Sequence, residues 1–366
     1  QHAVLRTCFR KEARGWKKQP CPPSQWTAIE VVDLRGKDAG AAAAMTEGVA
    51  DRVQASLDLT SGVVVRAVYF DTDPGMATRL LLVIHHLAVD GVSWRILLDD
   101  LATACRLLLA GEAILLAPAS SAPEAWASRL ARYARQETLA GEAEFWHTLR
   151  AAPPIWRDLE GTSPGTVGSE DCVSAELDAP YTSILLRDAA RTYQTSAFEL
   201  LVAALPGSLA RCTGSTQLYL LLEGHGREDL FPEIDLSRTV GWFTSLYPVL
   251  LDIRTTGAEP APMITGIKET LRAVPNKGLG FGLLRYLGTP AQRSRLAQIP
   301  EPQISFNYLG QTDQILPADA LVGLADGPQG RTRSPENPRT HLIEINALVR
   351  DGRLRVDWTF STDCHH

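Results

Sequence analysis

The chain has 366 residues, 45% of them apolar, enough to bury the core of one large domain or of two smaller ones. Its 42 acidic and 36 basic side chains leave a formal charge of −6, which argues against nucleic acid or an anionic membrane as a partner. No segment approaches the ~20 unbroken apolar residues of a membrane span.

The first half of the chain alternates short apolar runs with long helical patterns. Strands are predicted at residues 3–9, 26–34, 63–70 and 79–84. Helices are predicted at residues 39–57, 90–111 and 123–149. Asp90 is a suitable N-cap for the second helix, and Gly111 is a natural stop.

Basic side chains are concentrated near the N-terminus. Six of them lie in the first twenty residues: Arg6, Arg10, Lys11, Arg14, Lys17 and Lys18. We expect a solvated strand or hairpin here, with a docking patch for an acidic partner as the alternative.

Residues 151–168 are rich in Pro, Gly, Ser and Thr without apolar periodicity, which predicts a linker and a lobe boundary. Beyond it, strands are predicted at residues 172–177, 217–223, 246–253, 303–308, 341–349 and 353–360. Helices are predicted at residues 181–193, 196–212 and 263–274. Strands and helices mix without strict alternation, so we expect an α+β fold with two lobes, residues 1–165 and 166–366.

Six cysteines are spread along the chain with no CxxC pair: Cys8, Cys21, Cys105, Cys172, Cys212 and Cys364. This usage is typical of a reducing compartment, so we expect a cytoplasmic protein. The chain opens on an extended pattern and closes after a strand-like run, and we expect it to be a fragment of a longer polypeptide.

A pair of histidines follows the apolar run at residues 79–84. His85 and His86 come directly after it, and Asp90 begins a helix four residues later. Neighbouring strand residues point to opposite sides, so only one imidazole can face a given cavity. A neutral imidazole beside a helix N-terminus suits a general base, because its ordinary pKa lies near neutral pH. From the residues alone a structural or surface pair is the more frequent interpretation, and the spacing matches no standard metal site.

The whole string resembles the HHxxxDG motif of the chloramphenicol-acetyltransferase-like superfamily, which includes condensation and epimerization domains of nonribosomal peptide synthetases. Its extension, Gly91-Val-Ser-Trp-Arg-Ile-Leu97, resembles the version in epimerization domains. The resemblance implies that His86 is the catalytic histidine, that His85 packs inward, and that Asp90 is architectural. In the family this aspartate pairs with an arginine, for which the candidates here are Arg227 and Arg238.

Three further strings are similar to motifs of epimerization domains. Glu223–Glu228 reads EGHGRE, Thr239–Pro248 reads TVGWFTSLYP, and Ser305–Gln311 reads SFNYLGQ. On its own, a glutamate and a histidine among glycines is more often turn chemistry than a site. The four motifs occur in the family's order, so the chain is identified as a member of the epimerization domains by resemblance.

This resemblance implies an isomerase that converts an L-aminoacyl or peptidyl thioester into its D-isomer. The residues expected to be catalytic are His86, Glu223 and Tyr308, with Asn307 in support. The residues expected to line the substrate tunnel are Ser93, Trp94, His225 and Trp242. The implied fold is a V-shaped pseudo-dimer of two chloramphenicol-acetyltransferase-like lobes with that tunnel between them. The family's first strand and helix and its closing helix are expected to be missing from this sequence.

A thioester acidifies its α-proton, so the inversion is expected to need no cofactor of the domain's own and no metal. Two groups on opposite sides of the α-carbon suit a proton removal and return, and His86 and Glu223 are the candidates. Whether both act as bases, or one relays a proton through water, stays open. Candidate donors to the enolate oxygen are the helix N-terminus at Gly91, Asn307 and Tyr308.

The substrate is expected on the 4′-phosphopantetheine arm of a peptidyl carrier domain, and a downstream condensation domain is a further expected partner of this monomeric domain. Two alternatives remain. A condensation domain would form peptide bonds with the same histidine, but it typically lacks the glutamate found at position 223. A non-catalytic carrier-binding module would not need that glutamate or His86.

Overall fold

The computed structural model describes residues 1–13, 15–21, 29–151, 164–256, 259–316 and 322–365. The chain forms two compact units, each assembled from segments that are distant in sequence. The first unit contains Gln1–Pro123, Pro232–Trp242 and Ile315–Ser334, and the second contains Glu124–Phe231, Phe243–Gln314 and Pro335–His366. Both contain helices and strands, which confirms the predicted α+β class. None of the helices in the described residues has both the length and the apolar character needed to cross a bilayer.

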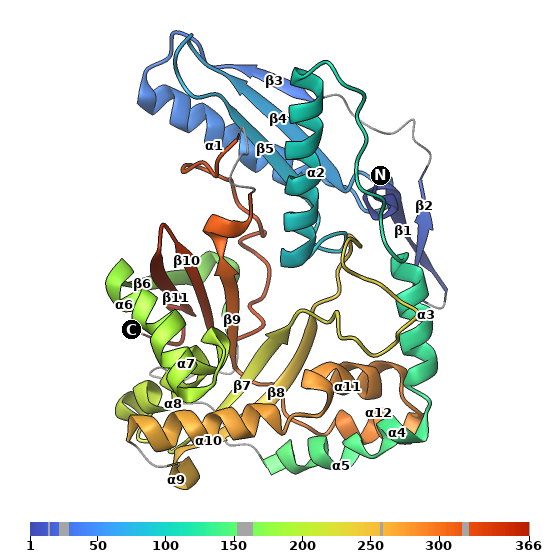
Figure 1. The fold of residues 1–366 in the computed structure, drawn as a ribbon, viewed down its shortest axis with the longest axis vertical. Helices are drawn as coiled ribbons and strands as arrows, with labels where there is room; N and C mark the ends of the chain where they lie inside the picture. Colours follow the sequence, from blue (N-terminus) through green and yellow to red (C-terminus); the bar gives the residue numbers. More distant parts are fainter. Residues whose placement is uncertain (14, 22–28, 152–163, 257–258, 317–321, 366) are drawn as a thin grey trace. The chain divides into compact units, whose positions relative to one another are not determined.

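A three-stranded sheet forms the centre of the first unit, in the order β3 (Glu30–Asp33), β4 (Val65–Asp71) and β5 (Arg79–Ile84). Strands β3 and β4 are parallel, and β4 and β5 are antiparallel. Helix α1 (Ala39–Ala55) lies beside this sheet, as Figure 1 shows. Its Val53 belongs to a buried cluster with alternate strand residues, including Val32 and Phe70. Burial of alternate residues on one face is what the strand pattern predicted.

Helix α2 (Gly91–Leu109) begins where the sequence predicted. The Asp90 carboxylate accepts a hydrogen bond from the Ser93 backbone N–H at 2.7 Å, as an N-cap does. Past the other end, Gly111 has a φ of +71°, the left-handed conformation that ends many helices. The helix boundaries therefore follow from local capping.

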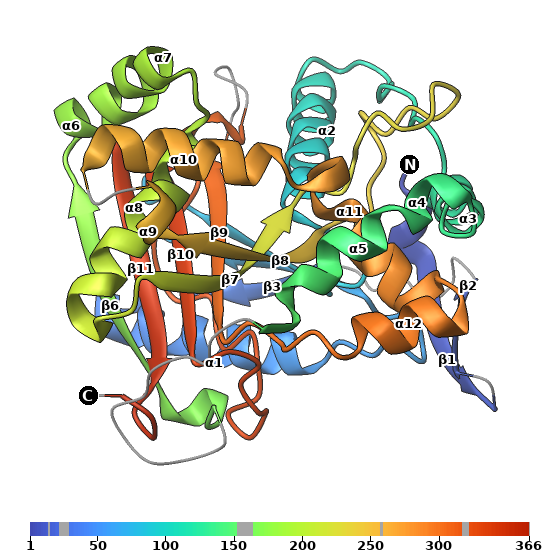
Figure 2. The ribbon, with the colours of Figure 1, turned by 90° about the horizontal axis from the view of Figure 1, so that it is seen from below.

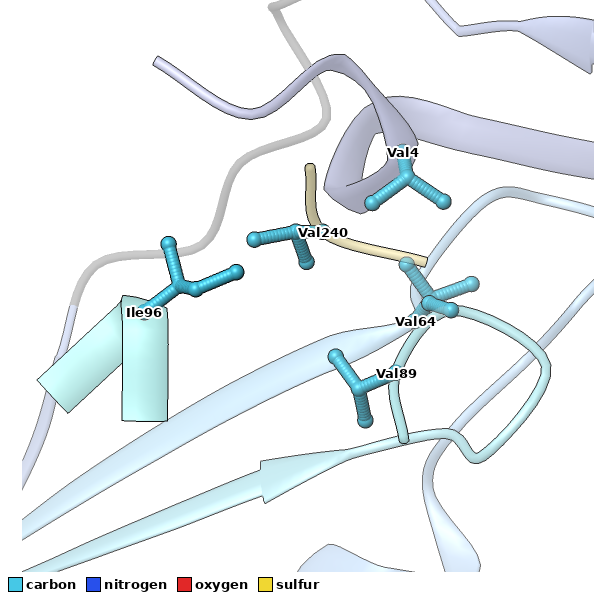
Figure 3. Packing of buried hydrophobic residues seen from close by; sticks show 6 residues of the cluster. Val4, Val64, Val89, Ile96 and Val240 are labelled. Atoms are coloured by element: carbon cyan, nitrogen blue, oxygen red, sulfur yellow. The ribbon is translucent and has the colours of Figure 1, made fainter. Parts of the chain in front are cut away.

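A second buried cluster joins α2 to distant parts of the first unit. Figure 3 shows Val4, Val64, Val89, Ile96 and Val240 pointing toward one another from different segments. This cluster includes the segment Pro232–Trp242 through Val240, which explains why that segment belongs to the first unit.

The N-terminal residues form a turn followed by a hairpin. Ala3–Arg6 is a short 3₁₀ helix, η1, and not the first half of a strand, so the prediction of a strand at residues 3–9 is wrong there. The Thr7 hydroxyl donates to the Val4 carbonyl oxygen at 2.7 Å, which satisfies an orphan acceptor of that turn. Four of the six basic residues, Arg10, Lys11, Lys17 and Lys18, lie on the antiparallel pair β1 (Thr7–Glu12) and β2 (Gly15–Pro20), as predicted for a hairpin. Arg6 ends η1, and Arg14 lies outside the described residues.

The second unit is built on a six-stranded sheet with the order β6-β11-β10-β9-β7-β8. Its strands are β6 (Glu170–Leu177), β7 (Gln217–Gly224), β8 (Ser245–Asp252), β9 (Ile304–Gln311), β10 (Ile343–Arg350) and β11 (Arg353–Ser361). The pairs β10–β9 and β9–β7 are parallel, and the others are antiparallel. All six strands predicted for this part of the chain are present, with shifted ends.

One face of this sheet is apolar and covered by helices. In β10 burial alternates with every residue, and the buried set begins with Ile343 and Ile345. Figure 2 shows α8 (Ala197–Thr213) and α10 (Pro260–Arg272) lying across the strands. Phe198 of α8 contacts Phe306 of β9, with 5.9 Å between ring centroids. In β10 the opposite face carries the more exposed and more polar half, which includes Glu344, Asn346 and Arg350.

Two predicted helices are interrupted. Residues 123–149 form α3 (Pro123–Tyr133), α4 (Glu137–Ala140), α5 (Glu142–His147) and a 3₁₀ turn, with Gly141 between α4 and α5. Residues 181–193 lie in α6 (Ala179–Ser183), a π-helical turn and α7 (Ala190–Tyr193). Three short helices were not predicted, because they are too short to show helical periodicity: α9 (Ile253–Thr256), α11 (Leu279–Gly282) and α12 (Pro290–Leu296).

The linker predicted at residues 151–168 lies mostly outside the described residues, since residues 152–163 are not among them. The two compact units divide the chain differently from the boundary expected at residue 165, because they exchange the segments Pro232–Trp242 and Ile315–Ser334. The lobe boundary itself stays a prediction.

Candidate active site

The two histidines lie in the turn between β5 and α2, in different environments. His85 is half-buried, and its Nδ1 accepts a hydrogen bond from the Leu87 backbone N–H at 3.1 Å. Burial and the neighbouring His86 imidazole lower the pKa of His85. Because Nδ1 acts as an acceptor, the neutral ring carries its proton on Nε2. The surroundings of His85 therefore favour its neutral form.

His86 is exposed and lies against an aromatic ring. Its imidazole and the Trp242 indole are 5.2 Å apart between centroids and inclined by 59°. Trp242 itself is 50% exposed, so the pair forms an accessible surface of the first unit. Of the residues expected to line a tunnel, Trp242 is thus placed directly beside the histidine expected to be catalytic.

Reciprocal hydrogen bonds hold the Trp242 segment on α2. The Ser93 hydroxyl is fully buried and donates a hydrogen bond to the Gly241 carbonyl oxygen at 2.8 Å. The same hydroxyl oxygen accepts a hydrogen bond from the Gly241 backbone N–H at 3.0 Å. The Ser93 N–H is occupied by Asp90, which is 3% exposed. Ser93 thus joins two chain segments, while Trp94 is partly buried against the cluster of Figure 3.

Arg238 pairs with two carboxylates of α2. Its guanidinium lies 2.9 Å from Asp99 and also contacts Asp100, and hydrogen bonding to Asp99 followed by the charge of Asp100 raises its pKa. Asp100 also contacts the His2 imidazole at 2.7 Å. Arg227 and Arg238 were the two candidates for the arginine that pairs with Asp90. Arg238 pairs instead with Asp99 and Asp100. A pair between Arg227 and Asp90 stays a prediction.

In the second unit, Glu223 lies near the carboxyl end of β7, opposite Leu246 of β8. The parallel ladder pairs Leu222 with Phe306 of β9, so Glu223 and Asn307 are next in the same register. Side chains alternate along a strand, and Glu223 and Asn307 therefore share one face of the sheet. Tyr308, the following residue, belongs to the other face, opposite Ala347 of β10.

The loop after Glu223 is held by a close backbone approach. Gly226 has a φ of +66°, and a Cβ there would lie 1.7 Å from the Phe243 carbonyl oxygen. The Arg227 guanidinium lies 4.2 Å above the centre of the Phe243 ring, a cation–π contact. Only glycine fits at position 226, which explains part of the EGHGRE string in purely structural terms.

Glu228 ends the string as an almost buried carboxylate with two partners. Its side chain is 11% exposed and lies 2.8 Å from the Lys277 ammonium and 3.3 Å from His225 Nε2. Burial and the charge of Glu228 raise the pKa of Tyr247 to about 12. Sequence reasoning missed Lys277. Asn276-Lys277-Gly278 indicates a turn, but nothing local to it indicates its partner.

The expected site residues fall in two groups. His86, His85, Asp90, Gly91, Ser93, Trp94, Arg238 and Trp242 belong to the first unit. Glu223, His225, Arg227, Asn307 and Tyr308 belong to the second. Among the residues that the structure describes, no group of three or more His, Cys, Asp or Glu side chains could hold a metal ion. The first set contains His86 and the second contains Glu223, and both are side chains that can accept and donate a proton in acid–base catalysis.

Curated relatives of this sequence belong to peptide synthetases. One component of the linear gramicidin synthase of Brevibacillus parabrevis is 41% identical over 370 residues, which cover 100% of this chain and 5% of that protein. Surfactin synthase subunit 2 of Bacillus subtilis (strain 168) is 35% identical over 364 residues, which cover 98% of this chain and 10% of that protein. The chain therefore spans a small part of the length of the relatives it matches.

Solved structures with the same fold include the epimerization domain from the third module of tyrocidine synthetase B. It is 32% identical, with a TM-score of 0.87 over 100% of this chain and 81% of that one. The first condensation domain of the calcium-dependent antibiotic synthetase has a TM-score of 0.74 at 21% identity, over 100% of this chain and 80% of that one, and shares the fold. The model of the condensation domain matches residues 1–366. The chain belongs to the condensation domain family of nonribosomal peptide synthetases.

Proposed function

We propose that this domain epimerizes the α-carbon of an L-aminoacyl or peptidyl thioester held on a peptidyl carrier domain, giving the D-isomer. The observation that carries this proposal is the difference between its structural relatives. The epimerization domain of tyrocidine synthetase B is 32% identical with a TM-score of 0.87, whereas a condensation domain of the same fold is 21% identical with a TM-score of 0.74.

The environment of Glu223 supports the same conclusion. Glu223 is a half-buried carboxylate at a strand end, next in register to the amide of Asn307. An epimerase needs such a proton carrier, because one proton leaves one face of the α-carbon and another returns to the opposite face. A condensation domain needs only one general base, so it has no use for a second proton carrier at this position.

In the proposed mechanism, His86 and Glu223 exchange protons with the two faces of the α-carbon. His86 is exposed on the first unit and contacts Trp242, which limits the orientations of its ring. A positioned acid or base contributes ~10²–10⁴-fold to the rate of such a proton transfer. The thioester stabilises the carbanion as an enolate, so the chemistry requires no cofactor of the domain's own.

The enolate oxygen is stabilised by hydrogen-bond donors in this proposal. The N-terminus of α2 is one candidate, but its Ser93 N–H already donates to the Asp90 carboxylate. At this helix the candidate donors to the enolate oxygen are therefore the backbone N–H groups of Gly91 and Val92. Asn307 is the further candidate on the Glu223 face of the second unit's sheet, and Tyr308 remains a candidate from the other face.

The carrier domain and the downstream condensation domain are the partners in this proposal. The relatives named above are synthetase polypeptides far longer than this chain, which supports a setting in which carrier and condensation domains are neighbours. The 4′-phosphopantetheine arm then belongs to the substrate, and the domain acts as a monomer in the cytoplasm.

The test uses a carrier domain loaded with an L-aminoacyl group and incubated with this domain in heavy water. We expect one deuterium at the α-position by mass spectrometry and a mixture of isomers after hydrolysis and chiral separation. His86→Ala and Glu223→Gln should each lower the inversion rate by ~10²–10⁴-fold. Glu47→Gln, at an exposed position of α1, is the matched control and should behave as wild type.

The same experiment separates the alternatives. A condensation domain or a carrier-binding module would leave the α-position free of solvent deuterium, and that result with wild-type protein would refute the proposal. Glu223→Gln should still wash deuterium into the isomer whose proton faces His86 without inverting it, and should lose exchange from the isomer whose proton faces Glu223.

A further inference from the structure

We infer that Lys277 is a positioning residue for the β7 end that carries Glu223, and that it acts through the Glu228 carboxylate. The inference rests on the proposed function for its catalytic consequence, but the contacts themselves do not depend on it. Lys277 is distant in sequence from every motif discussed above, and its ammonium lies 2.8 Å from Glu228.

The Lys277 segment has an unusual backbone. Asn276 and Lys277 have φ values of +44° and +49°, and Gly278 follows at +87°, so three consecutive residues are left-handed. Non-glycine residues adopt this conformation at a cost and keep it only where their surroundings enforce it. The conformation of Asn276 is held by hydrogen bonds that its side-chain amide donates to Glu142 and, at 3.3 Å, to the Tyr133 hydroxyl.

This strained segment packs directly against the end of β7. A Cβ on Gly278 would lie 2.0 Å from the Tyr247 ring, and one on Gly224 would lie 3.6 Å from the Lys277 carbonyl oxygen. Gly224 follows Glu223 in the chain. The Lys277 carbonyl oxygen therefore lies near the backbone next to Glu223.

Glu228 connects the loop after β7 to that segment. The Arg227 N–H donates to His225 Nδ1 at 3.0 Å, and His225 Nε2 lies 3.3 Å from the Glu228 carboxylate. Glu228 thus contacts both His225 and the Lys277 ammonium. The Glu228 side chain is 11% exposed and the Lys277 side chain 76% exposed, so the lysine reaches from solvent to a carboxylate that is mostly covered.

The inference predicts a rate effect without a comparable loss of folding. Lys277→Asn removes the ammonium while keeping a residue that tolerates the left-handed conformation. We expect kcat for α-proton exchange to fall ~10–100-fold with KM for the loaded carrier unchanged, because small displacements of a catalytic group cost that much. Lys277→Arg keeps the charge and should restore most of the rate.

The experiment compares Lys277→Asn, Lys277→Arg, Glu228→Gln and the double variant Lys277→Asn/Glu228→Gln with wild type and with Lys37→Asn as an exposed control. It measures kcat, KM, melting temperature, and amide hydrogen exchange in residues 222–230. A positioning network predicts faster amide exchange there for Lys277→Asn, recovery in Lys277→Arg, and no further loss in the double variant.

Two results would overturn the inference. One is a Lys277→Asn enzyme with kcat within twofold of the Lys37→Asn control. The other is a fall in apparent kcat that matches the loss of folded protein, with KM unchanged and no recovery in Lys277→Arg. If wild-type protein shows no α-proton exchange, the proposed function fails, and amide exchange in residues 222–230 alone tests whether Lys277 positions the end of β7. Unchanged amide exchange in Lys277→Asn would then refute the positioning role.

Discussion

Gly226→Ala tests whether the loop after Glu223 is held by its approach to the neighbouring strand segment. A Cβ at position 226 would lie 1.7 Å from the Phe243 carbonyl oxygen, and the closest tolerable approach is 3.0 Å. The loop must therefore move by about 1.3 Å, since the obstacle is backbone and cannot rotate away. That movement also separates the Arg227 guanidinium from the Phe243 ring, which now lies 4.2 Å below it.

The magnitude has two parts that a matched variant can separate. Gly226 and Gly214 have nearly the same φ, +66° and +69°, but a Cβ on Gly214 would meet nothing within 4 Å. Gly214→Ala thus measures only the left-handed backbone cost, about 1–2 kcal/mol. Gly226→Ala adds an overpacking cost of about 1–3 kcal/mol, so its free energy of unfolding should fall by about 2–5 kcal/mol in all.

Urea titrations of both variants followed by fluorescence measure these free energies, and deuterium exchange at the substrate α-position measures activity. A displacement near 1 Å is enough to lower the rate ~100-fold, so the folded Gly226→Ala protein should be slow, while Gly214→Ala should keep wild-type activity. If the two variants lose equal stability, or if Gly226→Ala is fully active, the close approach does not position the loop.

Three further predictions concern the first unit. Asp90→Ala should lower the free energy of unfolding by about 0.5–2 kcal/mol, while Asp90→Asn, which can still cap α2, should lose less; equal losses in urea titrations would contradict the capping role. Ser93→Ala leaves two buried backbone groups of Gly241 without their partner and should cost about 2–4 kcal/mol, with a change in Trp242 fluorescence; unchanged stability would refute the contact. The lowered pKa of His85 means that below about pH 6.5 the unfolded chain takes up a proton that the folded chain resists, so the urea midpoint should fall as the pH drops from 7.5 to 5.5. His85→Gln should flatten that dependence, and an identical pH profile would contradict the assignment.

Several features of this protein could be predicted from its sequence because they depend on neighbours along the chain. The Asp90 cap, the start of α2 and the left-handed Gly111 follow from interactions within one or two turns. The alternation in β10 and the capping box of α8, between Ser196 and Glu199, are equally local. His86 and Glu223 were predicted as site residues from motifs, which carry no information on the distance between them, and their roles stay a prediction.

The failures of prediction lie where a distant contact outweighs a local preference. The extended pattern at residues 3–9 gives way to η1 because Val4 is buried in a cluster whose other members come from residues 64–240. The order of strands in the six-stranded sheet has no local signal either.

The partners of charged side chains were decided only by the tertiary structure. Arg238 was expected beside Asp90 as one of two alternatives, yet it lies against Asp99 and Asp100. Lys277 reaches Glu228 across 49 positions of sequence. Capping and alternation are properties of a few consecutive residues, so the sequence alone determines them. Which cation reaches which carboxylate depends on how separate segments pack, and that information exists only in the folded chain.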